Sequence, residues 1–421
     1  MNIDEEKLYD VIVIGGGASG MMAAARAGAR GLSVLLLEKN KRLGEKLRIS
    51  GGGRCNILNA EEDERVLLAK YGDAEKFLYS LFAKFGMKDT FSYFEEKGLP
   101  LHVEGLKRAF PKSNKAEDVV NLLEEELKKD KVEIKRAVTI KNLEVKDGAI
   151  LFVQAGDIKY YAKEYILATG GLSHKETGST GDGFLWLSKL GHNVVSPTPE
   201  LVPLVSCSAW VKALSGTSLS DTAVSFYVDD KKAFTVKGRV LFTHFGLSGP
   251  LILNNSGKVA DLLHTGMVTA RIDLFYKVDH GTLDKLVVDI FDQNKNKELK
   301  NILKELLPEG MSKGVSLLLA EFFDIEKKVH SILKEERKEL VHLLKSMPAT
   351  IEGLMGFDKA IVADGGTPPE EIDFKTMRSK KCLNLFVTGD LLHINRPSGG
   401  YSLQLCWSTG YVAGSSVGEI S

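Results

Sequence analysis

Three glycines and an acid near the start of the chain have the spacing of a nucleotide-binding turn. The apolar run Val11–Ile14 ends in Gly15-x-Gly17-x-x-Gly20, an alanine-rich segment follows, and a second apolar run ends in Glu38. In such a turn the first glycine permits a tight bend, the second lets the backbone approach a pyrophosphate, and the third lets a helix pack closely on a strand. The pattern therefore predicts a strand–helix–strand unit that binds a dinucleotide.

The same unit predicts which groups would contact the two halves of that ligand. The N-terminus of the helix, at Ala18 and Ser19, offers free N–H groups and a partial positive charge to the phosphates. Glu38 lies 23 residues after Gly15, and its carboxylate is expected to accept hydrogen bonds from the ribose hydroxyls of the adenosine half. Lys39, the next residue, is expected to lie at the same end of the ligand.

A glycine-rich stretch, residues 44–56, is the most distinctive part of the sequence. Three consecutive glycines, Gly51–Gly53, permit a close backbone approach to a flat ring or a phosphate. Lys46 and Arg54 bring positive charge that is expected to meet the pyrophosphate. The alternative is a mobile surface loop, against which the embedded apolar and basic residues argue. The predicted cofactor contacts here are Gly44, Lys46, Ser50, Gly52, Gly53, Arg54, Cys55 and Asn56.

Glycines also follow two later predicted strands, at residues 169–171 and 389–390, and precede the last predicted helix, at residues 399–401. Together these segments favour FAD over a free nicotinamide. Ligands bind beyond the carboxyl ends of the strands in a parallel sheet. An extended FAD needs an acid near its ribityl chain, which Asp390 supplies. It also benefits from a helix N-terminus aimed at the N1–C2=O edge of the flavin, which residues 399–401 suit. The predicted contacts are Val138, Ala168, Thr169, Gly170, Gly389, Asp390, Gly399, Gly400, Tyr401, Ser402 and Leu403.

The elements that must position these residues predict an α/β chain with an insertion. Residues 1–198 and 355–421 are expected to form one Rossmann-like FAD-binding domain. Residues 199–280, with about 345–355, are rich in strand patterns and predict a β-barrel insert. Residues 281–345, rich in lysine and glutamate, predict a small helical insert.

Within the first domain, hydrophobic periodicity predicts the local elements. Residues 1–60 are interpreted as the first strand–helix–strand unit followed by a long glycine-rich connection. Residues 65–97 have helical spacing, and Val138–Val145 has the alternation of a strand. Ile158–Ala162 and Tyr165–Ala168 are predicted as two separate strands.

Composition excludes several classes of protein. Lys and Arg number 56, as do Asp and Glu, so the net charge is zero. This balance argues against a surface devoted to nucleic acid or anionic membrane. The four cysteines, Cys55, Cys207, Cys382 and Cys406, form no CxxC pair. They fit a reducing cytosol better than a disulfide scaffold or a zinc site.

The start of the chain and its hydropathy bear on location. Residues 1–10 are acidic and lack the basic and apolar regions of a signal peptide. The chain has no apolar run of about 18 residues, the length of a membrane span. We therefore expect a cytoplasmic protein with a small-molecule substrate, no metal, no nucleic-acid partner and no membrane partner.

Motifs along the whole chain resemble those of the YhiN/BaiN-like flavoproteins, known also as the aminoacetone oxidase family of FAD-binding enzymes. The matching segments are Ser50–Asn56, with the sequence SGGGRCN, then Phe110–Ala116, Ala168–Gly171, Thr177–Gly183, Leu241–Pro250, Thr376–Lys380 and Gly399–Gln404. The resemblance implies tightly bound FAD and a Rossmann-like domain interrupted by a β-barrel and a helical domain. It also implies oxidoreductase activity, either reduction of conjugated steroid-type enones such as bile acids or oxidation of amines. Thr180–Gly183 is more distantly similar to fumarate-reductase-type flavoproteins, where this segment lies near the flavin.

The chain departs from the family where substrate and flavin are expected to meet. Gly389-Asp390 replaces the usual Gly-Glu, and Asp can still reach a ribityl hydroxyl. Residues 392–396, Leu-His-Ile-Asn-Arg, replace the usual run similar to Asp-Val-Asp-Gly. Ser402 replaces the usual Asn.

Enone reduction needs a hydride for the β-carbon and an acid that protonates the α-carbon. The candidate acids are Tyr401, His393 and His174, and Arg396 is a candidate for polarising the carbonyl group. These residues also have non-catalytic interpretations. His174 would cap a loop, and Arg396 would be a solvated surface charge.

Three functions remain open on this sequence. The first is reduction of a conjugated C=C bond in a hydrophobic, bile-acid-like or steroid-like substrate by NAD(P)H. NAD(P)H would dock transiently, because no second GxGxxG has the strand and helix context. The second is a flavin amine oxidase that uses oxygen. The third, a flavin-dependent RNA-binding module acting through the basic segment 375–381, is disfavoured by the zero net charge.

Overall fold

The computed structural model describes residues 7–419, divided into two compact units. One unit is Met1–Pro199 with Ala360–Ser421, and the other is Glu200–Lys359. The acidic start on which we based the absence of a signal peptide lies mostly outside the described residues. No helix within residues 7–419 is long and apolar enough to cross a membrane.

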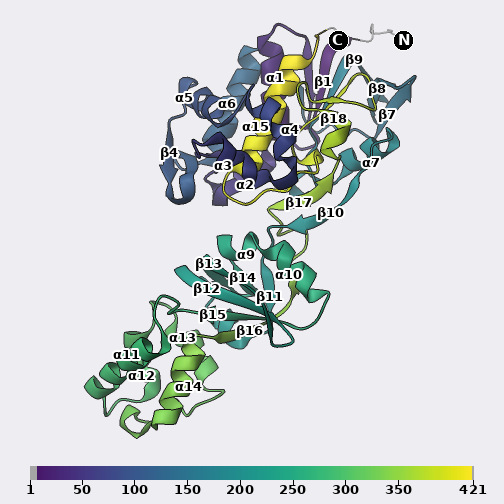
Figure 1. Ribbon diagram of the computed structural model, residues 1–421. Coiled ribbons are helices and arrows are strands. Elements are labelled where there is room, and N and C mark those ends of the chain that lie inside the picture. Colours follow the sequence, from purple (N-terminus) through teal and green to yellow (C-terminus); the bar gives the residue numbers. More distant parts are fainter. Residues whose placement is uncertain (1–6, 420–421) are drawn as a thin grey trace. The chain divides into compact units, whose positions relative to one another are not determined.

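A nine-stranded sheet forms the centre of the first unit (Figure 1). Its parallel core has the order β20–β9–β1–β2–β6. The strands β1, β2 and β20 are almost continuously apolar and buried, because elements cover both faces of a parallel sheet. The strands are β1 (Leu8–Ile14), β2 (Val34–Leu37), β6 (Glu133–Lys135), β7 (Asn142–Lys146), β8 (Ala149–Ala155), β9 (Ile158–Leu167), β18 (Ile372–Asp373), β19 (Arg378–Ser379) and β20 (Leu385–Val387).

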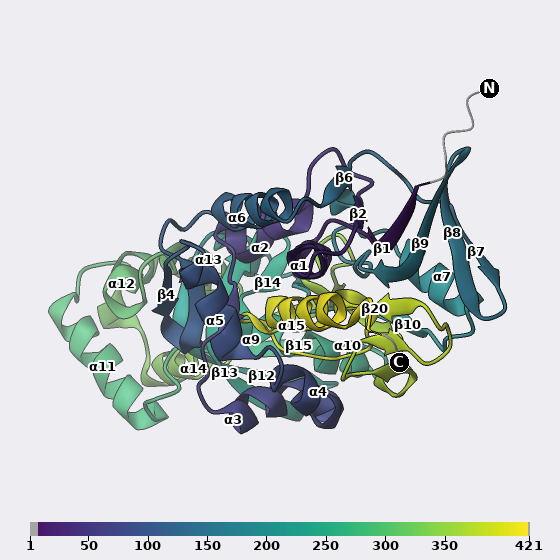
Figure 2. The same ribbon diagram turned by 90° about the horizontal axis from the view of Figure 1, so that it is seen from above.

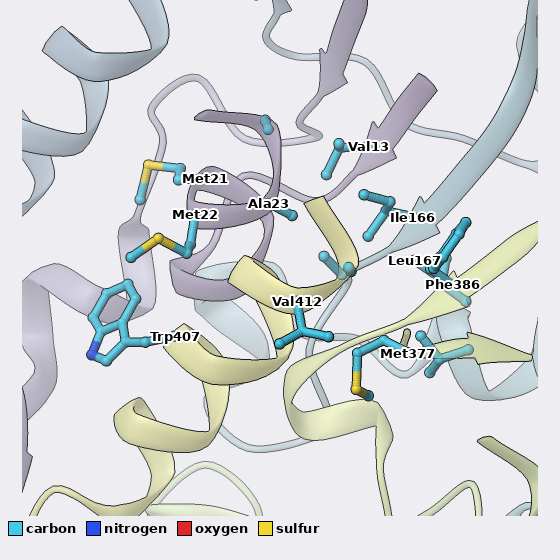
Figure 3. Close-up of a cluster of buried hydrophobic side chains, with 14 of the residues drawn as sticks. Val13, Met21, Met22, Ala23, Ile166, Leu167, Met377, Phe386, Trp407 and Val412 are labelled. Atoms are coloured by element: carbon cyan, nitrogen blue, oxygen red, sulfur yellow. The ribbon is translucent and has the colours of Figure 1, made fainter. Parts of the chain in front are cut away.

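Two helices from opposite ends of the chain lie side by side on this sheet, as Figure 2 shows. They are α1 (Ala18–Ala29) and α15 (Tyr401–Ser416). A Cβ atom at Gly410 would lie 2.4 Å from the Ser19 carbonyl oxygen, and one at Gly414 would lie 2.4 Å from the Ala23 carbonyl oxygen. Glycine at both positions therefore permits the close approach of the two helices. Figure 3 shows side chains of both helices packed with those of the sheet.

The remaining elements of the first unit surround this core. A small antiparallel sheet has the order β3–β5–β4, and β10 pairs with β17. The helices are α2 (Glu45–Gly53), α3 (Glu64–Leu68), α4 (Glu75–Phe82), α5 (Met87–Glu96), α6 (Ala116–Lys129) and α7 (Asp182–Lys189). The strands are β3 (Leu58–Asn59), β4 (Leu101–Glu104), β5 (Arg108–Pro111), β10 (Val195–Glu200) and β17 (Val362–Gly366).

Several local predictions need correction. The two strands predicted over 158–168 are one strand, β9, because its pairing with β1 continues across the polar residues Lys163 and Glu164. Residues 138–141 belong to no strand. The predicted glycine-rich connection contains α2, and the predicted helical stretch 65–97 is divided into α3, α4 and α5.

The second unit is a closed antiparallel barrel with helices inserted between its last two strands. The strand order is β11–β14–β13–β12–β15–β16. The strands are β11 (Leu204–Ser206), β12 (Ser218–Val228), β13 (Lys231–Thr243), β14 (Gly246–Ser248), β15 (Val268–Asp273) and β16 (Met347–Leu354). The helices are α8 (Ala209–Ala213), α9 (Pro250–Leu253), α10 (Ser256–Leu263), α11 (His280–Gln293), α12 (Leu299–Leu306), α13 (Ser312–Leu319) and α14 (Lys334–Leu344). Barrel and helices share one apolar core.

A buried histidine joins α7 to the β18–β19 edge of the large sheet. His192 Nδ1 lies 2.7 Å from Glu371 Oε2, and His192 Nε2 lies 2.7 Å from Ser379 Oγ. Ser379 Oγ already accepts the backbone N–H groups of Lys381 and Cys382. Its own proton therefore points to Nε2, so that Nδ1–H donates to Glu371.

This network predicts a loss of stability in mild acid. Burial lowers the pKa of His192 below its ordinary value. A neutral ring is therefore favoured in the folded state, and the free energy of unfolding should fall as pH drops below about 6.5. Denaturant unfolding between pH 8 and pH 5 tests this. His192→Gln should flatten the fall, whereas an equal fall in the variant and the wild type would contradict it.

Candidate cofactor site

The glycine turn leaves one side of the α1 N-terminus accessible. Gly15 has a φ of +108°, and a Cβ there would lie 2.4 Å from the Ala168 carbonyl oxygen. A Cβ at Gly20 would lie 1.9 Å from the Gly15 carbonyl oxygen. At Gly17 no atom lies within 4 Å of the Cβ position. The first and third glycines are therefore required for packing, and the second leaves room for a phosphate at the helix N-terminus.

The acid at the end of β2 is joined to this turn. Glu38 is 7 % exposed, and its carboxylate accepts the backbone N–H of Gly16 at 2.6 Å and of Asn40 at 2.7 Å. Burial raises the pKa of Glu38. Lys39 Nζ lies 2.9 Å from Asp182 Oδ2. These contacts bring the predicted segment 177–183 to the carboxyl end of β2.

Helix α2 breaks within the glycine-rich stretch. Gly51 and Gly52 have φ values of +57° and +70°. Arg54 lies over the Phe110 ring, 4.2 Å from its centroid, and forms an ion pair with Glu104. Its charge is therefore already neutralised within the protein. The thiol of Cys55 is buried, which raises its pKa to about 12.

Lys46, at the start of α2, is a half-buried cation. Its Nζ donates to Ser173 Oγ at 3.1 Å. Burial lowers the pKa of Lys46, while the nearby Asp390 opposes this effect and Arg396 adds to it. An ammonium group that is partly withdrawn from solvent is stabilised by a counter-charge, so Lys46 is suited to an anionic ligand.

The segment after β20 forms a buried ion pair between two predicted site residues. Asp390 pairs with Arg396, which is 3 % exposed, and Arg396 Nε donates to Ser402 Oγ at 3.1 Å. The alternative that Arg396 is a solvated surface charge is therefore wrong. Its guanidinium group is committed to Asp390, and Ser402 is in the first turn of α15.

The N-terminus of α15 is held by the last residue of the SGGGRCN motif and by residues that follow it. Gly400 has a φ of +102°, and a Cβ there would lie 2.2 Å from the Leu58 carbonyl carbon. With its amide oriented to match its neighbours, Asn56 accepts the Gly400 N–H at 3.0 Å. Asn59 Nδ2 donates to the Gly399 carbonyl oxygen at 3.1 Å, and Tyr71 OH donates to the Tyr401 carbonyl oxygen at 2.9 Å. Our sequence analysis missed Asn59 and Tyr71, for which no spacing signal exists.

The three candidate acids have different surroundings. His174 has a left-handed backbone, and its Nδ1 lies 2.8 Å from Glu176 on the same loop. Tyr401 is 8 % exposed, and burial raises its pKa. The His393 side chain is 36 % exposed and lies near Asp364. Of the three, His393 combines an accessible ring with a partly buried carboxylate neighbour.

The remaining predicted contacts all lie in the first unit, beyond the carboxyl ends of the central strands. The Val138 N–H donates to the Glu38 carbonyl oxygen, next to the end of β2. Thr169 Oγ1, just after β9, is buried without a hydrogen-bond partner among the described residues. Gly389, with a φ of +65°, starts the turn after β20. The orphaned hydroxyl of Thr169, the half-buried cation Lys46 and the accessible Gly17 at a helix N-terminus fit the ribityl chain and pyrophosphate of FAD.

Residues 9–416 match the family model described as the HI0933-like protein Rossmann domain. The chain belongs to this family. It is 30% identical over 412 residues to the 3-dehydro-bile acid delta(4,6)-reductase of Clostridium scindens, covering 97% of this chain and 98% of that relative. It is equally 30% identical to a ribosomal RNA dihydrouridine synthase of Haemophilus influenzae, covering 96% and 98%.

Solved structures share the fold of this family member. One is the 3-ketosteroid-delta4-(5alpha)-dehydrogenase from Rhodococcus jostii RHA1, with a TM-score of 0.53, 14% identity, and coverage of 100% of this chain and 99% of that one. Another is a flavocytochrome c3 fumarate reductase, with a TM-score of 0.50, 16% identity, and coverage of 98% and 78%. The protein is thus a flavoprotein oxidoreductase with an FAD-binding Rossmann-like domain and an antiparallel insertion. This confirms the predicted family, enzyme class and α/β architecture.

Proposed function

We propose that this protein uses NAD(P)H to reduce a C=C bond conjugated to a carbonyl group, in a hydrophobic substrate similar to a bile acid or steroid. Support comes from equal similarity to two relatives whose names describe one class of chemistry. A delta(4,6)-reductase saturates a steroid enone. A dihydrouridine synthase saturates the uracil double bond, which is also conjugated to a carbonyl.

The residues of the site suit this reaction. Bound FAD, once reduced, supplies the hydride. The N-terminus of α1 and Lys46 are suited to the pyrophosphate, and Asp390 and Thr169 to the ribityl chain. The observation that carries the proposal is the accessible imidazole of His393, three residues after Asp390, which we assign as the acid for the α-carbon.

The charges of the chain favour a small substrate over RNA. In the basic segment 375–381, Arg378 pairs with Glu164 at 2.7 Å, and Lys380 Nζ donates to the Glu370 carbonyl oxygen at 2.8 Å. These two cations are therefore already committed to the protein. Reduction of uridine in ribosomal RNA is the second candidate, supported by the names of two relatives, from Haemophilus influenzae and Escherichia coli.

An anaerobic flavin assay tests the proposal. NADH or NADPH should bleach the bound flavin, and 4-androstene-3,17-dione should restore its colour and yield the saturated ketone. His393→Gln should still be bleached, but its reoxidation by the enone should be about 100-fold slower. Reoxidation only by uridine-containing ribosomal RNA would favour the second candidate. A flavin that stays oxidised with NAD(P)H but forms peroxide with amines would identify an amine oxidase.

A further inference from the structure

We propose that Asp364 is a positioning residue that fixes the tautomer and orientation of His393, so that His393 Nε2 is the atom that protonates the substrate. This inference rests on the proposed function. Asp364 lies on β17, and His393 lies beyond the turn after β20. Asp364 Oδ1 and His393 Nδ1 are 3.4 Å apart. Both atoms are buried, and neither has a hydrogen-bond partner among the described residues.

The backbone holds the two side chains together. The Thr367 N–H donates to the Leu391 carbonyl oxygen at 2.8 Å, and the His393 N–H donates to the Thr367 carbonyl oxygen at 2.8 Å. These bonds anchor the segment that carries His393 beside the end of β17. These backbone hydrogen bonds therefore keep His393 Nδ1 close to Asp364 Oδ1. A small decrease in their 3.4 Å separation would give the distance of a hydrogen bond.

The carboxylate determines which ring nitrogen carries the proton in neutral His393. A carboxylate accepts only, so it favours a hydrogen on the facing Nδ1. Nε2 is then the nitrogen that gains and loses a proton, on a side chain that is 36 % exposed.

The reaction balances with these groups. FAD, when bound and reduced, would supply a hydride, with two electrons, for the β-carbon of the conjugated carbonyl compound. His393 Nε2 gives one proton to the α-carbon, and the C=C bond becomes a C–C bond. The ring is left neutral, with its Nδ1–H held by Asp364, and solvent returns a proton to Nε2.

The other accessible candidate histidine provides a matched control. His174 Nδ1 also faces a carboxylate, Glu176, at 2.8 Å, but the Glu176 side chain is 60 % exposed and belongs to the same loop. Removing that carboxylate should not affect His393. Glu176→Ala is therefore the control for Asp364→Ala.

The first test measures the tautomer without using activity. In the FAD-loaded protein with ¹⁵N-labelled histidines, long-range ¹H–¹⁵N spectra report which ring nitrogen carries hydrogen, and His393→Gln assigns the signal. We expect the Nδ1–H form for His393 in the wild type and in Glu176→Ala, and its loss in Asp364→Ala. A wild-type Nε2–H form, or an unchanged signal in Asp364→Ala, would overturn the inference.

The second test measures turnover of 4-androstene-3,17-dione. Asp364→Ala should lower kcat about 10- to 100-fold with little change in KM, less than the loss from removing the acid itself. Asp364→Asn, which can still accept from Nδ1–H, should recover part of kcat. Wild-type turnover with an unchanged kcat in Asp364→Ala would overturn the positioning role. A fixed Nδ1–H form without any enone turnover would instead refute the proposed function and support the tautomer assignment.

Discussion

Gly17→Ala is expected to give a folded protein that binds FAD more weakly than the wild type does. The backbone φ at Gly17 is −83°, which alanine adopts readily, and no atom lies within 4 Å of its Cβ position. The new methyl group would therefore disturb only a ligand at the α1 N-terminus. Loss of one hydrogen bond to a charged phosphate costs about 1.5–3 kcal/mol, or roughly 10- to 100-fold in affinity.

Flavin absorbance per purified chain and an FAD titration measure this effect. Gly356→Ala is the matched control, because Gly356 also has open space around its Cβ position and belongs to the second unit. It should keep wild-type FAD binding. Thermal unfolding of both apoproteins should resemble that of the wild type. Normal flavin content in Gly17→Ala would show that the phosphates do not approach this glycine.

Asp390→Ala is expected to have the largest effect on stability. It would leave the buried Arg396 guanidinium, 1 % exposed at its side chain, without its carboxylate, and it would remove a counter-charge of Lys46. Removing one partner of a buried ion pair costs about 3–5 kcal/mol. Denaturant unfolding with and without added FAD measures the change in the free energy of unfolding.

Two further variants test whether the loss of stability comes from the unpaired, buried Arg396 and not from the removal of any ion pair. Arg396→Met in the Asp390→Ala background removes the unpaired cation and should restore much of the lost stability. Asp182→Ala breaks the more exposed pair with Lys39, in which the side chains are 37% and 26% exposed. That change should cost about 0–1 kcal/mol. Equal losses for Asp390→Ala and Asp182→Ala would contradict the role assigned to burial.

The sequence by itself determined the family, the FAD-binding strand–helix–strand unit and the α/β architecture with its insertion. These features are local: the glycine spacing at 15, 17 and 20 follows from a single turn, and strands and helices follow from short periodic patterns. The structure adds the reason for each glycine, since Gly15 and Gly20 are required by close backbone contacts and Gly17 is not.

Only the tertiary structure decided which charged and polar side chains meet. Arg396 could be a surface charge or a substrate contact on sequence grounds, and burial beside Asp390 makes it part of an ion pair. Asp364 carried no signal, because its partner His393 lies 29 residues away and the contact depends on how β17 pairs with another segment. Pairings between distant residues arise from packing of the whole chain, which no local pattern encodes.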